Sequence, residues 1–415
     1  MRRIRGVVSW CVGAAVLCLL ASASPAGEVD ILIKKLVEKG ILSEEDAKEI
    51  VAEIEKELKH EEQKIAKREI PSSSEWTERV RLKGDLRLRY QVEKRDGDAV
   101  ERHRARIRYR LGVEADISDT VTVGAGLASG GADPRSTNQT LQDTFDTPDI
   151  RLDYAYAVWT PAEWLSIKGG KFKNPVWRTT GFMWDGDIRP EGAAARLSWD
   201  EIAYGGDGFL NVGIFMMDES ADDGSDPFMW VVQPGCSWDI RDSVKLKAAV
   251  VYYGFQNEQG TTLDYTAGTN TLENGVLKYQ YDSVGASAEF GIHNPFNCEY
   301  IPYWTVFGDF IYNPDPSDDN IGFCAGTKIG NERLSKQGQW QARTCYLYLE
   351  QDAWPDTFPD GDYYGGQTNS WGAVSSVSYA LHNNVILVLD YIHCEKIDGP
   401  GRPDDMGRGN LLFFF

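Results

Sequence analysis

Two neighbouring segments of the chain alternate arginine with apolar residues, and this alternation constrains the fold more than any other feature. The segment RHRARIRYRLGVEADI, residues 102–117, begins with arginine at every second position. Residues 79–91 repeat the pattern, with Leu86 and Leu88 between charged neighbours and Tyr90 after Arg89. Successive side chains of a β-strand point to opposite faces of the sheet. Each segment is therefore predicted to be a strand with one apolar face and one strongly basic face.

The same two-residue period continues to the end of the chain and gives about sixteen candidate strands. Their approximate spans are 79–91, 101–117, 119–130, 149–160, 163–173, 190–200, 207–218, 228–241, 243–255, 278–291, 298–312, 319–330, 338–353, 369–382, 384–396 and 408–415. Short connectors such as 118–119 alternate with long polar ones such as 131–148, and the strand number is even. Both features are typical of bacterial membrane barrels. Because backbone groups in lipid need hydrogen-bond partners, such a sheet must close. We therefore predict an all-β, transmembrane antiparallel β-barrel of about 16 strands.

The first part of the chain follows other patterns. Residues 1–26 combine three early arginines with an apolar run shorter than the roughly 20 residues of a membrane span, which predicts a signal peptide. Residues 27–70 are rich in Glu and Lys, with apolar residues three or four apart, and predict a periplasmic, coiled-coil-like helical segment. Pro71 and the serines after it predict a linker over 71–77. The barrel is assigned to 78–415.

Composition excludes several classes of function. The formal net charge of -20 argues against binding of nucleic acid, which needs a basic surface. No pair of cysteines has the spacing of a zinc or haem site, so we expect no metal and no cofactor. Five cysteines follow the signal peptide, and their pairing is left open: Cys236, Cys298, Cys324, Cys345 and Cys394. The five histidines lack the HExxH and GxSxG motifs, and we predict no catalytic residue and no enzyme.

Four stretches carry a resemblance to a known family: RHRARIRYRLGVEADI, GLASGGADPRSTNQTLQDTF, LDYAYAVWTPAEWLSIKGGKFKNP and MWDGDIRPEGAAARLSW. The chain resembles bacterial outer-membrane porins in which a short helical segment precedes the barrel. This resemblance implies a water-filled channel in the outer membrane of a Gram-negative bacterium, commonly a homotrimer, surrounded by lipid and lipopolysaccharide. Phe413 and Phe415 are similar to the carboxy-terminal signal that the barrel assembly machinery reads. For the N-terminal helical segment three interpretations stay open: contact with peptidoglycan, self-association and packing beneath the barrel.

A barrel also determines which face of each strand lines the lumen. An arginine in lipid at the bilayer midplane would cost about 2–4 kcal/mol, so the arginines must point inward. The predicted pore-lining residues are Arg87, Arg89, Arg102, Arg104, Arg106, Arg108, Arg110 and Asp153. By analogy with general porins, the loop after the fifth strand, residues 174–190, folds inward. Its predicted constriction residues are Trp184, Asp185, Asp187 and, just beyond, Glu191. Asp-rich segments elsewhere, including 360–362, are interpreted as solvated loops, and the alternative is that they hold calcium or bridge lipopolysaccharide through divalent cations.

This arrangement predicts passive diffusion of small polar solutes and ions, with a preference for anions because charged rings select ions in pores. Three alternatives stay open. The barrel is a sleeve or scaffold for a partner protein such as an electron carrier, or it is an outer-membrane hydrolase. The third alternative is a secreted soluble β-sandwich, which would have to explain the strand number and the apolar terminal strand. Conductance of the protein alone distinguishes a channel from a filled sleeve. The sequence does not identify the solute.

Overall fold

The computed structural model describes residues 77–95, 99–219, 226–240 and 243–415. The chain divides into two compact units, Met1–Trp76 and Thr77–Phe415, and only the second is described. The predicted signal peptide, the predicted helical segment and almost all of the predicted linker therefore lie outside the described residues.

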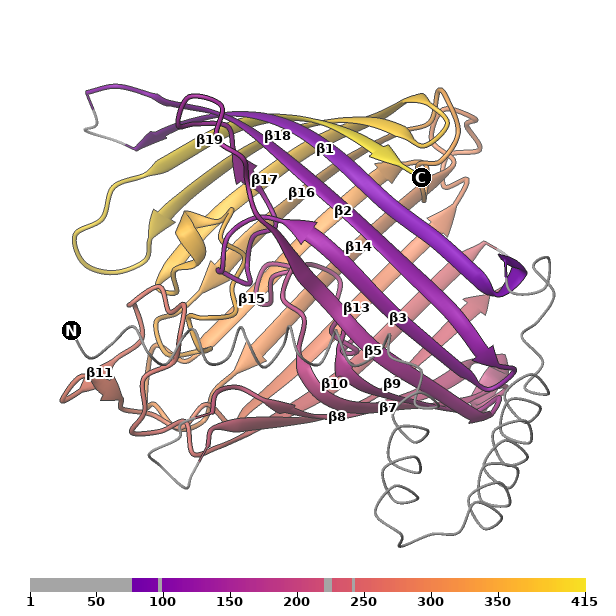
Figure 1. Ribbon diagram of the computed structural model, residues 1–415, viewed down its shortest axis with the longest axis horizontal. Coiled ribbons are helices and arrows are strands. Elements are labelled where there is room, and N and C mark those ends of the chain that lie inside the picture. The colour runs from indigo at the N-terminus through magenta and orange to yellow at the C-terminus, as the bar shows by residue number, and fades with distance from the viewer. Residues whose placement is uncertain (1–76, 96–98, 220–225, 241–242) are drawn as a thin grey trace, which may run out of the picture. The chain divides into compact units, whose positions relative to one another are not determined.

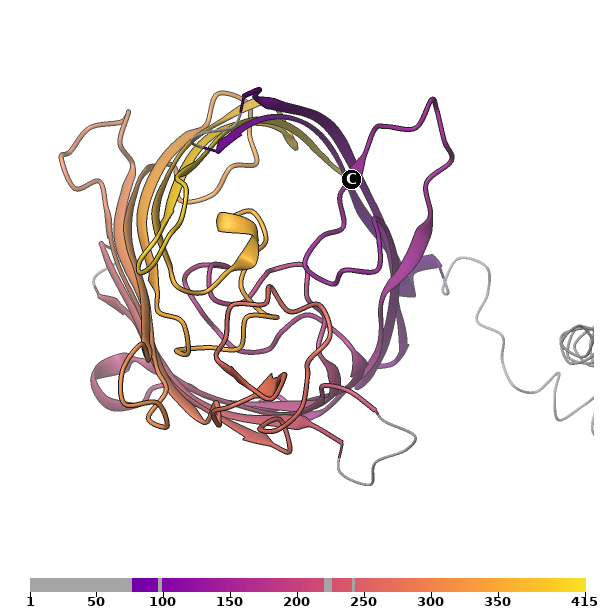
Figure 2. The ribbon, with the colours of Figure 1, turned by 90° about the vertical axis from the view of Figure 1, so that its left-hand side faces the viewer.

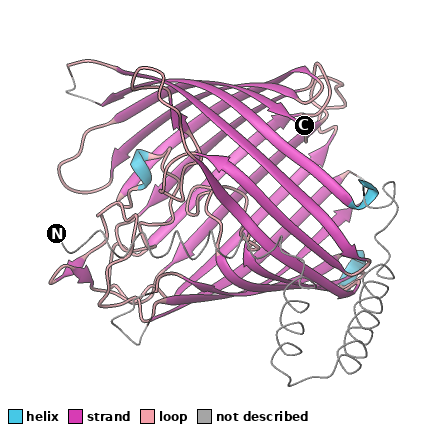
Figure 3. Cartoon of the chain, viewed as in Figure 1, coloured by secondary structure: helices cyan, strands magenta, loops and turns pink. Residues whose placement is uncertain are grey.

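Sixteen long antiparallel strands of the described chain form a closed barrel (Figures 1 and 3). They are β1 (Val80–Arg95), β2 (Arg102–Ser118), β3 (Val121–Ser129), β5 (Ile150–Ala162), β6 (Leu165–Lys171), β7 (Glu191–Trp199), β8 (Asp207–Met216), β9 (Phe228–Ile240), β10 (Val244–Gln256), β13 (Ser283–His293), β14 (Tyr303–Tyr312), β15 (Ile321–Gly330), β16 (Trp340–Leu349), β17 (Ser370–His382), β18 (Val385–Lys396) and β19 (Asp404–Phe414). Each strand pairs with the next, and β19 pairs with β1 to close the barrel. Every predicted span overlaps one of these strands, so the predicted antiparallel barrel is confirmed.

A few short elements accompany the barrel. β4 (Gln139–Thr140) pairs with β2 beyond the end of β3, and β11 (Leu272–Glu273) pairs with β12 (Val276–Leu277). Two 3₁₀ turns, η1 (Ala203–Gly205) and η2 (Tyr364–Gly366), complete the list. No helix among the described residues is both long enough and apolar enough to span a membrane.

The two faces of β1 show how lipid and lumen are separated. Leu82, Leu88 and Tyr90 are exposed on the outside of the barrel, and 71% of the surface of Leu82 is accessible. Asp85 and Arg89 on the opposite face are buried, with Arg89 only 5% exposed. The alternation follows because neighbouring side chains of a strand leave the sheet on opposite sides.

The apolar core lies inside the barrel, because long loops fold into it (Figure 2). The first inward loop comprises residues 172–190, between β6 and β7, and the second inward loop comprises residues 350–369, between β16 and β17. Trp354 of the second loop is 1% exposed. Its ring lies 4.7 Å from Tyr253 of β10, 5.5 Å from Phe358 and 6.1 Å from Trp184 of the first loop, as measured between ring centroids.

Buried polar side chains of the wall hold the first inward loop in place. Asp309 of β14 accepts hydrogen bonds from the backbone N–H groups of Thr179 and Thr180 at 2.8 and 2.9 Å, and from both hydroxyls. Gln233 of β9 accepts from the N–H of Trp177 at 2.8 Å and donates to its carbonyl at 2.7 Å. Since buried backbone groups need partners, these contacts specify the path of the loop.

The interior is therefore divided into two sides. Apolar side chains of β8–β10 and β14–β16 pack against the inward loops and fill one side. The other side is bordered by β19, β1 and β2, whose buried interior residues include Asp85, Arg89 and Arg108 and are mostly charged or polar. The five cysteines are all free, so no disulfide contributes to this packing.

Candidate functional site

The basic face of β1 and β2 brings several arginines together inside the barrel. In the register of these strands Arg87 lies opposite Arg108, and Arg89 lies opposite Arg106. Like charges directly opposite each other in a sheet are destabilising. The site must therefore supply negative charge close to this wall.

Asp85 supplies part of that charge from within the wall itself. Its carboxylate accepts hydrogen bonds from Arg108 Nε at 2.9 Å and Arg108 Nη2 at 2.7 Å. Its second oxygen accepts from Arg110 Nε at 2.7 Å. Asp85 is 6% exposed, so these charge-assisted bonds are shielded from water, which strengthens them.

Asp187 of the first inward loop supplies further negative charge. It accepts from Arg110 Nη1 at 3.2 Å, and from the N–H and hydroxyl of Thr137 at 3.1 and 2.9 Å. Burial opposes ionisation of this carboxyl, but Arg108 and Arg110 outweigh burial and lower its pKa. Asp187 thus joins the loop to the basic wall and to the segment 130–138.

The second inward loop also contributes acids, which the sequence interpretation had placed in a solvated loop. Asp362 accepts two hydrogen bonds of 3.1 Å from Arg89 and another from Arg408 of β19. Arg408 also donates to Asp390 of β18 at 2.7 Å. Burial opposes ionisation of Asp362, yet Arg408 and Arg89 lower its pKa below the ordinary value. The interpretation of 360–362 as a solvated segment was therefore wrong.

The two inward loops are bonded to each other where their acids meet. Asp185 N–H donates to the Phe358 carbonyl at 2.8 Å, and Asp360 N–H donates to the Phe182 carbonyl at 3.0 Å. Trp184 stacks on Phe358 with 4.6 Å between ring centroids. Burial and the Asp360 carboxylate raise the pKa of Asp185 to about 10. Burial and the Asp362 carboxylate raise the pKa of Asp360 to about 6.

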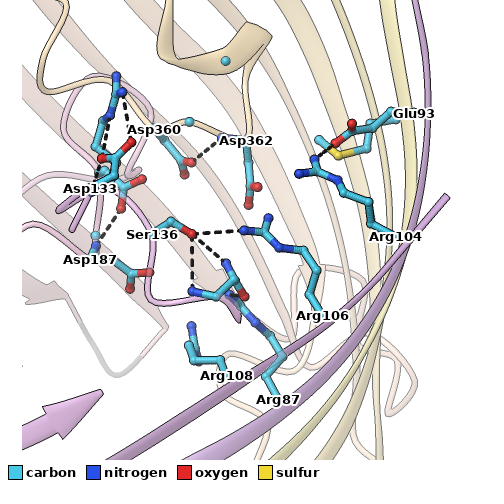
Figure 4. A pocket seen from close by; sticks show the side chains of 17 residues that line it. Arg87, Glu93, Arg104, Arg106, Arg108, Asp133, Ser136, Asp187, Asp360 and Asp362 are labelled. Carbon is cyan, nitrogen blue, oxygen red and sulfur yellow. Dashed lines mark hydrogen bonds and ion pairs between the residues drawn. The ribbon is translucent and has the colours of Figure 1, made fainter. Parts of the chain in front are cut away.

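A pocket of about 350 Å³ separates the basic wall from these loops. In Figure 4 the labelled arginines extend from the wall, and the labelled aspartates extend from the loops opposite. The lining includes Arg87, Arg104, Arg106, Arg108, Arg135, Ser136, Asn138, Asp133, Asp185, Asp187, Asp360 and Asp362. Among the described residues, no group of three or more histidine, cysteine or acidic side chains is arranged to hold a metal ion.

Most of the residues singled out from the sequence lie at or beside this pocket. Six line it: Arg87, Arg104, Arg106, Arg108, Asp185 and Asp187. Three contact lining residues or their loops: Arg89, Arg110 and Trp184. Arg102, the first residue of β2, borders a neighbouring pocket of about 140 Å³.

Two of the proposed residues lie elsewhere. Asp153 is buried at a bulge of β5 and pairs with Arg189 at 3.3 Å. Glu191 begins β7 and pairs with Lys171 at 2.5 Å, and 63% of its side chain is exposed. Ala194, three residues further along β7, belongs to the interior core, so Glu191 points away from the interior.

Several site residues were not singled out from the sequence, namely Arg135, Arg408, Asp390, Asp360 and Asp362. The second inward loop did carry a signal. Trp354, Phe358, Tyr363 and Tyr364 give it more aromatic surface than a solvated loop needs, and Trp354 is almost completely buried.

Comparison with known proteins gives an independent view of the chain. A family model described as "Putative porin" matches residues 96–289 and 306–407. The search of curated proteins gave no match. The chain is similar to the high-pH structure of Pseudomonas putida OprB, with a TM-score of 0.54 and 10% identity over 82% of this chain and 96% of that one. It is also similar to Salmonella typhi OmpF in complex with daunomycin, with a TM-score of 0.50 and 11% identity over 81% of this chain and 97% of that one. At these identities the likeness concerns the fold alone.

Proposed function

Because the chain belongs to a porin family and forms an outer-membrane channel, we propose that it is a passive diffusion pore for small polar solutes and ions that prefers anions. The observation that carries the proposal is the basic wall of the pocket. Arg87, Arg104, Arg106 and Arg108 come from two neighbouring strands and border one space inside the barrel. Charged side chains that line a pore are a known basis of ion selectivity.

The direct test is the single-channel current of the purified protein in planar bilayers under a potassium chloride gradient. We expect stable conductance steps and a reversal potential with the sign of anion preference. A reversal potential of the opposite sign would refute the anion preference but not the channel function. A folded, inserted protein that carries no current would favour the sleeve.

Lowering the pH from 7.5 to 5 is expected to increase the anion preference. The pKa of Asp360 is about 6, so its carboxylate takes up a proton in this range and the pocket loses a negative charge. Asp185, with a pKa of about 10, stays protonated throughout, and Asp362, whose pKa is lowered, stays ionised. One charge at about 4 Å in water contributes about 1 kcal/mol, so the change in selectivity is expected to be modest.

The pH effect is measured as the shift in reversal potential between the two pH values. Asp360→Asn carries no charge at either pH and serves as the matched control. The assignment to Asp360 fails if the reversal potential of the variant shifts as much between the two pH values as that of the unmodified protein.

The assembly of the channel is part of the same proposal. We propose a homotrimer in lipid and lipopolysaccharide, inserted by the barrel assembly machinery through Phe413 and Phe415. Phe415 is placed at the seam of the barrel, since it exchanges backbone hydrogen bonds of 2.8 and 3.1 Å with Gly84 of β1. Attachment of the N-terminal segment to peptidoglycan belongs to this proposal as well.

A further inference from the structure

The arginines around the pocket differ in whether a carboxylate neutralises them. Six of them form ion pairs: Arg89 and Arg408 with Asp362, Arg108 and Arg110 with Asp85, Arg104 with Glu93, and Arg135 with Asp133. Arg87 and Arg106, which also line the pocket, form no ion pair with any described residue. Two positive charges are thus left without a protein counter-charge in direct contact.

The partners of these two arginines are neutral and lie side by side on one segment. Arg87 Nη2 donates to the side-chain oxygen of Asn138, and Arg106 Nη2 donates to the Ser136 hydroxyl at 3.4 Å. The Nε–H groups of both arginines, and that of Arg104, are buried without a partner among the described residues. A buried donor without a partner is costly. A guanidinium carries five N–H donors, so each has donors to spare for a ligand.

The register of the strands adds a second argument. Arg87 is directly opposite Arg108, and Arg106 is directly opposite Arg89. The carboxylates nearby are already shared, since Asp85 bonds to two arginines and so does Asp362. A negative charge between Arg87 and Arg106 would relieve repulsion that the protein's own acids leave uncompensated.

We propose that Arg87 and Arg106 form a binding site for the carboxylate or phosphate group of a small solute passing through the pore. This inference rests on the proposed channel function and names the chemical class of its preferred solute. The planar guanidinium matches the geometry of an oxyanion and can bind it through two parallel hydrogen bonds. The pocket of about 350 Å³ has room for a small organic acid as well as for inorganic phosphate.

The test uses inorganic phosphate and succinate as probes of the chloride current through single channels. A solute that binds in the pore delays the ions that follow it, so each probe is expected to reduce the chloride current in a saturable way. Arg87→Gln and Arg106→Gln should each weaken this block about tenfold or more, since hydrogen bonds between charged groups are strong. Arg196→Gln removes a different interior arginine, which contacts Asn211 and the Phe209 ring, and should keep the block.

Two further variants test whether the block depends on the charge of the arginines or on the geometry of their donors, and their conductance excludes misfolding. Arg87→Lys and Arg106→Lys keep the positive charge but lose the paired donors, and are expected to weaken the block while preserving the chloride current. A variant that still conducts has folded and inserted, so loss of block in it cannot be attributed to misfolding.

The outcomes distinguish this inference from the function on which it rests. Block by both probes, or by one of them alone, supports the site and identifies the accepted oxyanion. An anion-preferring current that neither probe reduces, or a block that survives both glutamine replacements, overturns the site and leaves the channel intact. The absence of any current from inserted protein overturns the proposed function itself.

Discussion

Replacing Arg87 and Arg106 together by glutamate is expected to turn the proposed anion preference of the channel into a preference for cations. Both side chains border the pocket between the barrel wall and the inward loops, which is the proposed path of the ions. Each exchange changes the local charge by two units, and one unit at about 4 Å in water is worth about 1 kcal/mol. The aspartates of the loops would then face glutamates, and the pocket would favour potassium.

The sign of the reversal potential under a potassium chloride gradient reports this change directly. The double replacement Arg87→Lys and Arg106→Lys keeps both charges and should retain the anion sign. Arg196→Glu, which alters the charge of a distant interior arginine, should shift the potential much less. If the double glutamate variant conducts with an unchanged reversal potential, ions do not pass along this wall.

Deleting residues 411–415 is expected to prevent the barrel from forming. Residues of this stretch pair with two strands, since Leu411 lies opposite Leu88 of β1 and Leu387 of β18. Without them both strands would have unpaired backbone groups near lipid, at several kcal/mol for each group. Refolding into detergent micelles, followed by protease digestion, should give almost no resistant barrel.

Phe415→Ala tests whether the terminal side chain has a role beyond this pairing. The ring stacks on Tyr109 with 6.3 Å between centroids, but the backbone bonds to Gly84 do not need it. The variant should therefore refold in detergent, whereas in cells its amount in the outer membrane should fall if the assembly machinery reads the ring. A truncated chain that refolds to a resistant barrel would show that the seam closes without its last residues.

The strands could be predicted from the sequence because successive side chains alternate between lipid and the interior, and the resulting period of two is plain where the interior side is charged, as in β1 and β2. The largest errors in the strand boundaries precede β13 and β14, which begin at Ser283 and Tyr303 and not near 278 and 298. Tyr279 and Tyr281 in the first of these stretches alternate as strand residues do. Tyr281 instead lies fully buried in the connection between β10 and β13, where its hydroxyl donates to Asp352 of the second inward loop at 3.0 Å.

The site was predictable only in part, because some of its contacts join residues that are far apart in the sequence. The basic face of β1 and β2 follows from the alternation, and the first inward loop was expected from the resemblance to porins. That a second loop also enters the barrel depends on contacts such as Trp354 with Tyr253, which are far apart in sequence. Glu191 was placed in the site by its proximity to the loop, but the phase of β7 turns it away from the pocket.

Because the apolar core lies inside the barrel, the barrel wall and the inward loops are stabilised by different interactions. The wall is stabilised by a closed ring of backbone hydrogen bonds and by lipid, whereas the loops around Trp354 are stabilised by burial of side chains away from water. Urea and low temperature weaken the second kind of stabilisation directly. The loops can therefore melt inside an intact barrel, and the protein would then remain in the membrane with a wider and less discriminating passage.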